Sequence, residues 1–493
     1  MEKKVKVREL LSKRDLRHLA IIDYLLEHPF VTIKEMSSDL SISSKTISLD
    51  IKDINSYIAN VRIDISFDGV TLVMPKNVSS RYLYHEVLMQ SREIEIIEKL
   101  FFNTHNNLEA LADEFYLSEI TLRRDINDIN KIFKALDIRI NIKKMIFTGS
   151  EIGLLLLMIN ILSEKYYSTS WYINDKQLSV LNEILECMIP DKNFNYPDLE
   201  KLRQWLYLKI TLIKKRGIKV NEEEYKEYNP DISDSLREEF HRAFAIELTT
   251  ENLYYMFEQF QNDNYLFSYD RLLEIVDTNQ TKAEAYEKVI SLIESIEYTL
   301  KIDCPNKDEL VLEIFNSINV PDIPSFIIYN RNKSFIDNLP LSLDPVLSYA
   351  MELLNEFFKD DLKEHQMNEL LYIMLTHWSN FIANLSKSVG DIKVGVFYDN
   401  DIEHTTFICE ALTEASPVDV EPIVLQEIDI STIEKMLPDI DLLVTNVPNI
   451  KSAEDKVICT DDFPSIGDWR TYRVDVLRIY NAKVIELINN KED

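Results

Sequence analysis

The sequence is poor in glycine, in paired cysteines and in long apolar runs. Only 7 of its 493 residues are glycine, so loops must be short or built on Asn, Asp and Pro, which favours a helix-rich fold. Four cysteines lie far apart without metal-site spacing, namely Cys187, Cys304, Cys409 and Cys459. Such cysteines indicate reduced, mostly buried thiols in a cytoplasmic protein.

Membrane and cofactor signals are also missing. No run of about 18 uncharged apolar residues occurs, which argues against a membrane span. The opening residues, MEKKVKVREL, are charged and lack the apolar core of a signal peptide. Neither the dinucleotide-binding nor the phosphate-loop glycine pattern is present. A chain of this length exceeds one core, so we expect a cytoplasmic protein of several domains, without a cofactor, a metal or a membrane partner.

Positive charge is lacking overall but not everywhere. The net charge is −30, yet residues 1–150 carry 22 basic and 22 acidic groups. The remaining 343 residues carry 32 basic and 62 acidic groups. An acidic body repels nucleic acid, so any DNA contact is expected in the neutral N-terminal third, with modest affinity per protomer.

The most informative pattern is an internal repeat. KEMSSDLSISSKTISLDIKDINSYI, from Lys34, aligns with EALADEFYLSEITLRRDINDINKIF, from Glu109, at a constant offset of 75 positions. A short helix, a turn that begins at a Ser and a second amphipathic helix predict a helix-turn-helix in each copy.

Each copy has further elements in the same order. LRHLAIIDYLLEH before the first copy has helical apolar spacing, and the segment Glu93 to Phe102 precedes the second. RIDISFDGVTLVM predicts a hairpin around Asp68-Gly69, and DIRINIKKMIFTG alternates in the same place after the second copy. Two winged helices are therefore expected, at residues 1–75 and 76–150.

The rest of the chain changes rhythm twice. Long amphipathic helices are expected up to about Ser386, with acidic or Asn/Pro breaks near Pro190, Pro230, Asn279 and Pro321. A weak repeat relates YPDLEKLRQWLYLKITLI to CPNKDELVLEIFNSINV and ENLYYMFEQF to ELLYIMLTHW. From Asp391 strands and helices alternate, which indicates a small α/β domain with a parallel sheet. The predicted fold class is multidomain and mostly α.

These parts, in this order, resemble the Mga-like virulence and global regulators of Gram-positive bacteria, the group that includes the anthrax toxin activator. The resemblance implies two helical domains like phosphotransferase-system regulatory domains (PRD-like, 151–270 and 271–388) and an enzyme IIB-like domain (389–493). It implies a DNA-binding transcription regulator, an activator and not an enzyme, that acts as a homodimer. A phosphocarrier protein of the phosphotransferase system is the further implied partner.

The candidate contacts with double-stranded DNA follow from the repeat. Because Ile47, Ile51 and Ile54 form an inward stripe, the opposite face of that helix points outward. Arg can read guanine, and Ser, Thr or Lys can reach bases or phosphates. The assigned residues are Ser43, Ser44, Lys45, Ser48, Lys52, Ser118, Thr121, Arg123, Arg124 and Asn127, with Lys143 and Lys144 at the tip of the second wing.

One alternative qualifies this assignment. Any single basic residue in it could lie on a solvated helix face without contacting DNA. Four further basic residues are expected to give the N-terminus a basic edge, namely Arg8, Lys13, Arg14 and Arg17.

A regulatory site is implied by the resemblance. His377 matches the second histidine position of a regulatory domain, whereas Lys209, Gln259 and Ser317 or a neighbour stand at the other three. His241 is out of register but could substitute. The alternative for His377 is a core or interface histidine with a satisfied hydrogen bond, and His365 is expected at the surface.

The α/β domain lacks the residue that an active enzyme IIB domain needs. The loop after its first strand, Tyr398 to Asp401, contains no cysteine, and Cys409 falls in the following helix. A noncatalytic dimerisation or regulatory module is expected, and the acidic runs Glu222–Glu224 and Asp461-Asp462 are expected as solvated loops. For the whole chain, the alternatives to a DNA-binding transcription regulator are a phosphotransferase component and an RNA-binding antiterminator that carries the same regulatory repeats.

Overall fold

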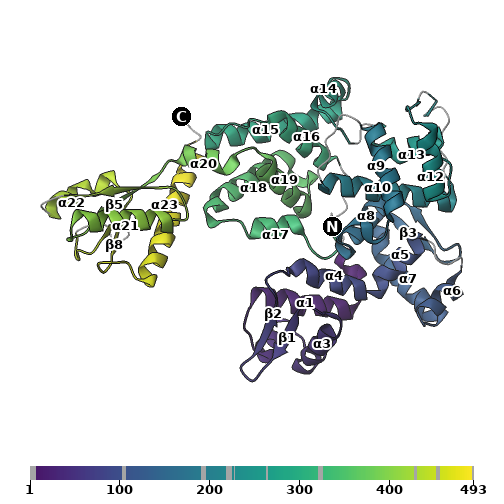
Figure 1. Ribbon diagram of the computed structural model, residues 1–493, viewed down its shortest axis with the longest axis horizontal. Coiled ribbons are helices and arrows are strands. Elements are labelled where there is room, and N and C mark those ends of the chain that lie inside the picture. The colour runs from purple at the N-terminus through teal and green to yellow at the C-terminus, as the bar shows by residue number, and fades with distance from the viewer. Residues whose placement is uncertain are drawn as a thin grey trace. The chain divides into compact units, whose positions relative to one another are not determined.

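The structure, a computed structural model, describes residues 7–102, 107–189, 196–217, 225–226, 228–261, 265–319, 326–426, 430–450 and 456–490. Helices predominate, as the scarcity of glycine predicts (Figure 1). The chain forms two compact units. Unit 1 comprises Met1–Tyr265 with Val320–Arg331, and unit 2 comprises Leu266–Asn319 with Asn332–Asp493. Separate apolar cores lie within them.

The first winged module has the predicted helix-turn-helix and wing. Its elements are α1 (Lys13–Glu27), α2 (Ile33–Asp39), α3 (Ser44–Tyr57), β1 (Arg62–Ile65) and β2 (Val70–Val73). The wing is antiparallel, with Ile63 opposite Leu72, and a bridge from Val31 to Val70 extends it. The turn of the wing requires glycine at position 69, because a Cβ there would lie 2.7 Å from the carbonyl oxygen of Val31.

The second winged module repeats this plan. After α4 (Ser80–Gln90) come α5 (Arg92–Phe102), α6 (Leu108–Glu114), α7 (Glu119–Phe133), β3 (Ile138–Asn141) and β4 (Ile146–Gly149). The two strands pair antiparallel, with Ile140 opposite Phe147. The second wing is therefore confirmed in the place that the alternation predicted.

Two helical regions follow the winged modules. In unit 1 the first contains α8 (Glu151–Lys165), α9 (Asp175–Met188), α10 (Tyr196–Arg216), α12 (Asp234–Phe244) and α13 (Thr250–Gln261). In unit 2 the second contains α14 (Tyr269–Thr278), α15 (Gln280–Leu300), α16 (Lys307–Ile318), α17 (Arg331–Asp337), α18 (Asp344–Phe358), α19 (Glu364–His377) and α20 (Phe381–Val389).

The weak repeat in the helical regions maps onto matching helices. α10 packs against α13 in unit 1, and α16 packs against α19 in unit 2. The predicted breaks near Pro190 and near Pro321 lie outside the described residues. The division into five domains stays a prediction, because the structure separates the chain only into the two units.

The C-terminal region is the expected α/β structure. A four-stranded parallel sheet has the order β6-β5-β7-β8. Its elements are β5 (Ile392–Phe397), α21 (Ile402–Ala415), β6 (Val420–Val424), α22 (Ile430–Met436), β7 (Leu442–Thr445), β8 (Val457–Cys459) and α23 (Ile466–Asn489). The last helix begins at Ile466, because Ser465 and Asp468 form a capping box.

The same asparagine ties each wing to its recognition helix. The side chain of Asn55 donates to the carbonyl oxygen of Ile63 (2.8 Å) and accepts from its N–H (2.9 Å). Asn130, which is 75 positions later, makes the same pair of bonds with Ile140 (3.0 and 2.7 Å). Each wing is therefore fixed to α3 or α7 through buried backbone groups.

Replacing Asn55 or Asn130 by Ala is expected to lower the free energy of unfolding by about 2–6 kcal/mol, because two buried backbone groups lose their partners at ~1–3 kcal/mol each. Urea titration followed by circular dichroism measures this change. Asn127→Ala is the matched control, since this side chain is exposed on the same helix as Asn130, and it is expected to change stability by at most about 0.5 kcal/mol. Equal stability of all variants would contradict the role of the asparagines.

Candidate nucleic-acid interface

The turns of the two helix-turn-helix motifs have the same backbone geometry. Ser41 and Tyr116, which are equivalent at the offset of 75, both adopt the left-handed conformation, with φ of 55° and 54°. This region favours glycine, yet neither position is glycine. The turn geometry is therefore imposed by the packing of the helices on either side.

The caps of the recognition helices are also duplicated. Ser43 accepts the backbone N–H of Thr46 (3.1 Å), and Ser118 accepts that of Thr121 (3.2 Å). In each pair the two hydroxyl groups are also hydrogen-bonded to each other (2.7 and 2.9 Å). Ser43, Ser118 and Thr121, assigned above as DNA contacts, thus already serve as capping groups, although both serines stay exposed.

The inward faces of α3 and α7 are those that the periodicity predicts. At most 1% of each side chain is exposed along both stripes, which consist of Ile47, Ile51 and Ile54 in α3 and of Leu122, Ile126 and Ile129 in α7. The opposite faces are therefore held toward solvent.

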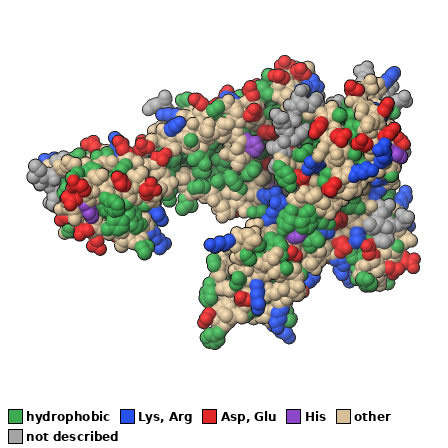
Figure 2. All heavy atoms as spheres, viewed as in Figure 1, with side chains coloured by type: hydrophobic (Ala, Val, Ile, Leu, Met, Phe, Trp, Pro, Cys, Tyr) green, Lys and Arg blue, Asp and Glu red, His purple; other side chains and the backbone are tan. Residues whose placement is uncertain are grey.

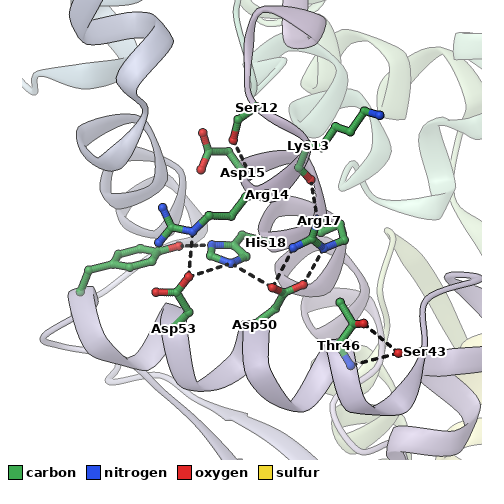
Figure 3. A network of polar contacts seen from close by, with 11 residues as sticks. Ser12, Lys13, Arg14, Asp15, Arg17, His18, Ser43, Thr46, Asp50 and Asp53 are labelled. Atoms are coloured by element: carbon green, nitrogen blue, oxygen red, sulfur yellow. Dashed lines mark hydrogen bonds and ion pairs between the residues drawn. The ribbon is translucent and has the colours of Figure 1, made fainter. Parts of the chain in front are cut away.

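An ion pair with a buried aspartate connects α1 to α3 in the first module and α5 to α7 in the second. Arg17 on α1 donates to Asp50 on α3 through Nε (2.7 Å) and Nη2 (3.0 Å), as Figure 3 shows. Arg92 lies 3.0 Å from Asp125 on α7. Both pairs keep the offset of 75, and the aspartates are only 6% and 7% exposed. Each pair fixes how its recognition helix is rotated, because a buried carboxylate must keep its partner.

Sequence reasoning missed the two arginines. The aligned repeat begins only at Lys34, so Arg17 is assigned to a basic edge and Arg92 to no role. Extending the same offset backward by 17 positions would have aligned the two arginines and found the pairs.

A buried histidine lies beside the first pair. His18 on α1 is 1% exposed. Its Nδ1 is 3.0 Å from the Tyr57 hydroxyl, and its Nε2 is 3.6 Å from carboxylates of Asp50 and Asp53 (Figure 3). Burial lowers the pKa of His18, against the opposing effect of Asp50. Glu93, the equivalent residue in the second module, has its pKa raised by burial.

The outward face of α3 is polar and weakly basic. Ser44, Lys45 and Lys52 are exposed, and Ser48 is half-buried with its hydroxyl donating to the carbonyl oxygen of Ser44 (3.0 Å). Leu49 is 56% exposed on the same face. Figure 2 shows basic side chains on this part of the first module and many acidic side chains over the helical and α/β regions.

The outward face of α7 carries two arginines and an asparagine. Arg123, Arg124 and Asn127 are exposed. Nε of Arg124 lies 3.7 Å from the carboxylate of Asp125, which already pairs with Arg92. Ile120 is 82% exposed beside them. Guanidinium groups on an exposed helix face can form bidentate hydrogen bonds with guanine, and an amide can do so with adenine.

The two wings differ at their tips. Lys143 and Lys144 are exposed at the turn of the second wing, where their backbone N–H groups donate to Asn141 (both 3.1 Å). The first wing instead presents a fully exposed Phe67 next to Asp68. Of the two wing tips, only the second therefore carries basic side chains.

The expected basic edge at the N-terminus is largely neutralised. Arg8 pairs with Asp23 (2.6 Å) and Arg14 with Asp53 (2.7 Å), while Arg17 holds Asp50. Three of the four cations thus stabilise the module, and the fourth, Lys13, is exposed. The edge is a structural feature in the main and offers DNA little free charge.

The candidate phosphorylation sites are both exposed. His377 ends α19, and its Nδ1 is hydrogen-bonded to the hydroxyl of Thr376 (3.0 Å). It is therefore not a core histidine. His241 on α12 is 53% exposed and lies 3.2 Å from Glu247. His365, expected at the surface, is half-buried, and burial lowers its pKa.

Of the positions that depart from the regulatory-domain pattern, Lys209 has a structural role. Lys209 is 1% exposed and paired with two carboxylates, of Glu151 (3.0 Å) and Glu258 (2.5 Å). Ser317 is half-buried. In the part of the chain that the structure describes, no three His, Cys, Asp or Glu residues are grouped as metal ligands.

In the α/β region, the loop after the first strand contains no cysteine. There, Asp401 caps α21 by accepting the N–H of His404 (2.8 Å), and the N–H of Asp399 donates to Asn446 (3.0 Å). Cys409 is buried within α21 as expected, and burial raises its pKa to about 11. A protonated thiol is a poor nucleophile.

The expectations for the cysteines and for the acidic runs are each confirmed only in part. Of the four cysteines, Cys304 and Cys409 are buried but Cys187 and Cys459 are exposed, so burial holds for half of them. Asp461 and Asp462 are exposed as expected, whereas Glu222–Glu224 lie outside the described residues. Within the described ranges, no helix combines the length and apolarity needed to cross a bilayer.

Comparison with known proteins places the N-terminal third in a family. The model of the Mga helix-turn-helix domain matches residues 3–73 and again 76–162. The two matches follow the two winged modules, and the second runs on into α8.

Regulators from two organisms are similar to larger parts of the chain. A protein of Streptococcus pneumoniae serotype 4 named as a trans-acting regulator is 21% identical over 465 residues, which cover 90% of this chain and 94% of that protein. The capsule synthesis positive regulator AcpA of Bacillus anthracis is 23% identical over 61% of this chain and 65% of its own. The anthrax toxin expression trans-acting positive regulator of the same organism is 25% identical over 38% and 40%.

The stability of the first module is expected to depend on pH through His18. The pKa of this histidine is lower in the folded than in the unfolded chain, so the unfolded chain binds the proton first. The neutral histidine therefore stabilises the fold above about pH 6.5, and this contribution is lost as the pH falls below that value.

Thermal unfolding between pH 7.5 and 5 tests this dependence. The unfolding temperature of the wild type is expected to fall more steeply with decreasing pH than that of His18→Gln. His28→Gln serves as the control, because His28 is an exposed histidine at the end of the same helix. Parallel curves for the wild type and His18→Gln would show that His18 does not titrate in this way.

Proposed function

We propose that this chain, which belongs to the Mga-like family of regulators, binds double-stranded DNA through both winged modules and controls transcription from the sites that it occupies. The observation that carries the proposal is the duplicated recognition helix. α3 and α7 have the same serine cap, the same buried stripe and the same arginine–aspartate pair, so their outward faces are presented in the same way. Rigid presentation of a polar helix face is what major-groove reading requires.

The two modules make different kinds of contact with DNA. Arg123, Arg124 and Asn127 on α7 have the chemistry for base edges, where bidentate bonds discriminate between bases. On α3, Ser44, Lys45 and Lys52 suit phosphates and mixed contacts, along with Ser48. Lys143 and Lys144 on the second wing add phosphate or minor-groove contacts. The second module thus supplies most of the sequence discrimination.

The distribution of charge along the chain supports a need for two protomers in DNA binding. The first 150 residues carry no net charge, and all 30 excess negative charges lie in the remainder. Winged modules without net positive charge gain little binding free energy from counterion release, so a single protomer is expected to bind DNA weakly. We propose that a homodimer presents two pairs of modules to two half-sites, with the acidic helical and α/β regions providing assembly. Activation is the mode that the relatives named as positive regulators favour.

Regulation by phosphorylation is the finer part of the proposal. His377 is exposed at the end of α19, where a phosphocarrier protein of the phosphotransferase system could reach it. Phosphorylation would add about two negative charges at one point. Such a charge shifts an assembly of acidic regions by repulsion. His241 is the second acceptor candidate because it too is exposed.

Two other functions remain testable against this one. A phosphotransferase component would need an acceptor that passes the phosphoryl group on, and the loop after β5 contains no cysteine. An RNA-binding antiterminator would bind hairpin RNA in preference to duplex DNA. Measuring the binding of both nucleic acids at one salt concentration separates an antiterminator from a DNA-binding regulator.

Replacing Arg123 and Arg124 together by Ala is expected to weaken specific DNA binding by about 1–3 kcal/mol for each bidentate arginine–guanine pair that the substitution removes. Fluorescence anisotropy measures the change in affinity, with duplexes recovered by genome-wide mapping of bound DNA. Binding to a shuffled duplex is expected to change much less.

Arg242→Ala with Arg271→Ala is the matched control. Both are exposed arginines that pair with a glutamate of their own helix, outside the winged modules. This control is expected to bind as the wild type does. If the Arg123/Arg124 variant also binds as the wild type does, the residues that read the bases lie elsewhere.

Incubation with phosphoenolpyruvate, enzyme I and the general phosphocarrier is expected to label the wild type and not His377→Ala, because the imidazole is the acceptor. His28→Ala, which removes an exposed histidine of the first module, should keep the label. Label that persists in His377→Ala and disappears in His241→Ala would move the acceptor to α12. A wild type that takes up no label would remove phosphorylation from the proposal.

A further inference from the structure

The second wing continues into α8 without slack. Only Ser150 separates β4 from the helix, and its N–H donates to the carbonyl oxygen of Asp137 (2.6 Å) while its hydroxyl caps α8 through the N–H of Gly153 (3.1 Å). At Gly149, which has a φ of 100°, a Cβ would lie 2.0 Å from the same oxygen of Asp137. The path from wing to helix is therefore stereochemically fixed.

The first wing has no such connection. Six residues, 74–79, separate β2 from α4, and Ser79 makes no side-chain cap for that helix. Of the two wings, only the second is therefore joined directly by the chain to the start of α8. This is also the wing with Lys143 and Lys144 at its tip.

The first residue of α8 is held by the helical region behind it. The carboxylate of Glu151 accepts from Nζ of Lys209 on α10 (3.0 Å) and from the hydroxyl of Tyr255 on α13 (2.6 Å). Arg216, at the end of α10, donates to its second oxygen. Three donors from two helices therefore determine where α8 begins.

Lys209 is the centre of this network. Its side chain is 1% exposed, and its ammonium lies between Glu151 and Glu258 (2.5 Å) and 3.9 Å from the ring centroid of Tyr255. A buried ammonium is tolerated only while it is paired, and loss of one partner leaves a costly isolated charge. Such networks act as units, so the positions of α10 and α13 and of Glu151 are coupled.

We infer that Lys209 is a positioning residue for DNA binding: through Glu151 it sets the start of α8 and thereby the placement of the second wing on DNA. This inference rests on the proposed function and adds a route by which the first helical region controls it. Lys209 is buried and cannot touch a phosphate itself. Its effect on DNA binding must therefore pass through Lys143 and Lys144.

The test is a double-mutant cycle on the full chain. Lys143→Ala with Lys144→Ala is expected to lower the slope of log affinity against log salt concentration by about 2, since each phosphate contact contributes roughly 0.9. Lys209→Met is expected to lower the slope by the same amount and to weaken binding roughly tenfold. The combined variant is expected to bind no more weakly than either alone.

Two further variants separate positioning from a general loss of stability. Glu151→Gln removes the charge of the link from a half-buried site and is expected to reproduce the reduced slope with less effect on folding. Arg203→Met removes another cation of α10, which pairs with Glu200 (2.9 Å) and not with Glu151. It is expected to lower the unfolding temperature and leave the salt slope unchanged.

Any one of four outcomes would overturn the inference. Folded Lys209→Met or Glu151→Gln could bind with the wild-type slope, the effects in the double-mutant cycle could simply add, or Arg203→Met could lower the slope equally. If the Lys143/Lys144 variant itself keeps the wild-type slope, the second wing does not touch phosphate and Lys209 has no wing to position. DNA binding by the modules would survive that result, because the Arg123/Arg124 variant tests it separately.

Discussion

An ion pair between an arginine on the first helix and an aspartate on the recognition helix is the constraint on which each winged module depends. The aspartate is almost fully buried in both modules, so its charge is tolerable only while the arginine holds it. The pair sets the rotation of α3 or α7 about its axis, because the apolar stripe and the aspartate must face inward together. The outward face, where DNA contacts are proposed, is a consequence of that choice.

Side chains supply the precise connections that glycine would provide in other folds. Hydroxyl caps begin the helices after Ser12, Thr32, Ser43 and Ser118. The tight turns are left-handed at Ser41 and Tyr116, so surrounding packing must stabilise a conformation that costs a non-glycine residue free energy. A chain built this way has little slack between elements. Direct continuation of the second wing into α8 is the clearest case.

Charge and packing together explain how an acidic protein can bind DNA. The excess of acidic groups lies outside the winged modules, and within the modules many arginines are consumed by internal pairs. What remains for the proposed DNA contacts is a small set of polar and basic groups on α3, on α7 and at the tip of the second wing. Weak, specific contacts of this kind favour assembly-dependent binding over indiscriminate wrapping of DNA. They also make binding sensitive to anything that repositions one wing.

The sequence by itself determined the winged modules, since a gapless repeat, serine caps and 3.6-residue periodicity are local signals. It also indicated the helical middle and the parallel α/β region, and it separated the buried from the exposed face of each recognition helix. It could not assign Arg8, Arg14 and Arg17 correctly, because whether a cation faces DNA or a carboxylate 15 to 39 residues away is decided by packing. Tertiary structure alone likewise buried Lys209 between Glu151 and Glu258, since those three residues meet only when α8, α10 and α13 come together.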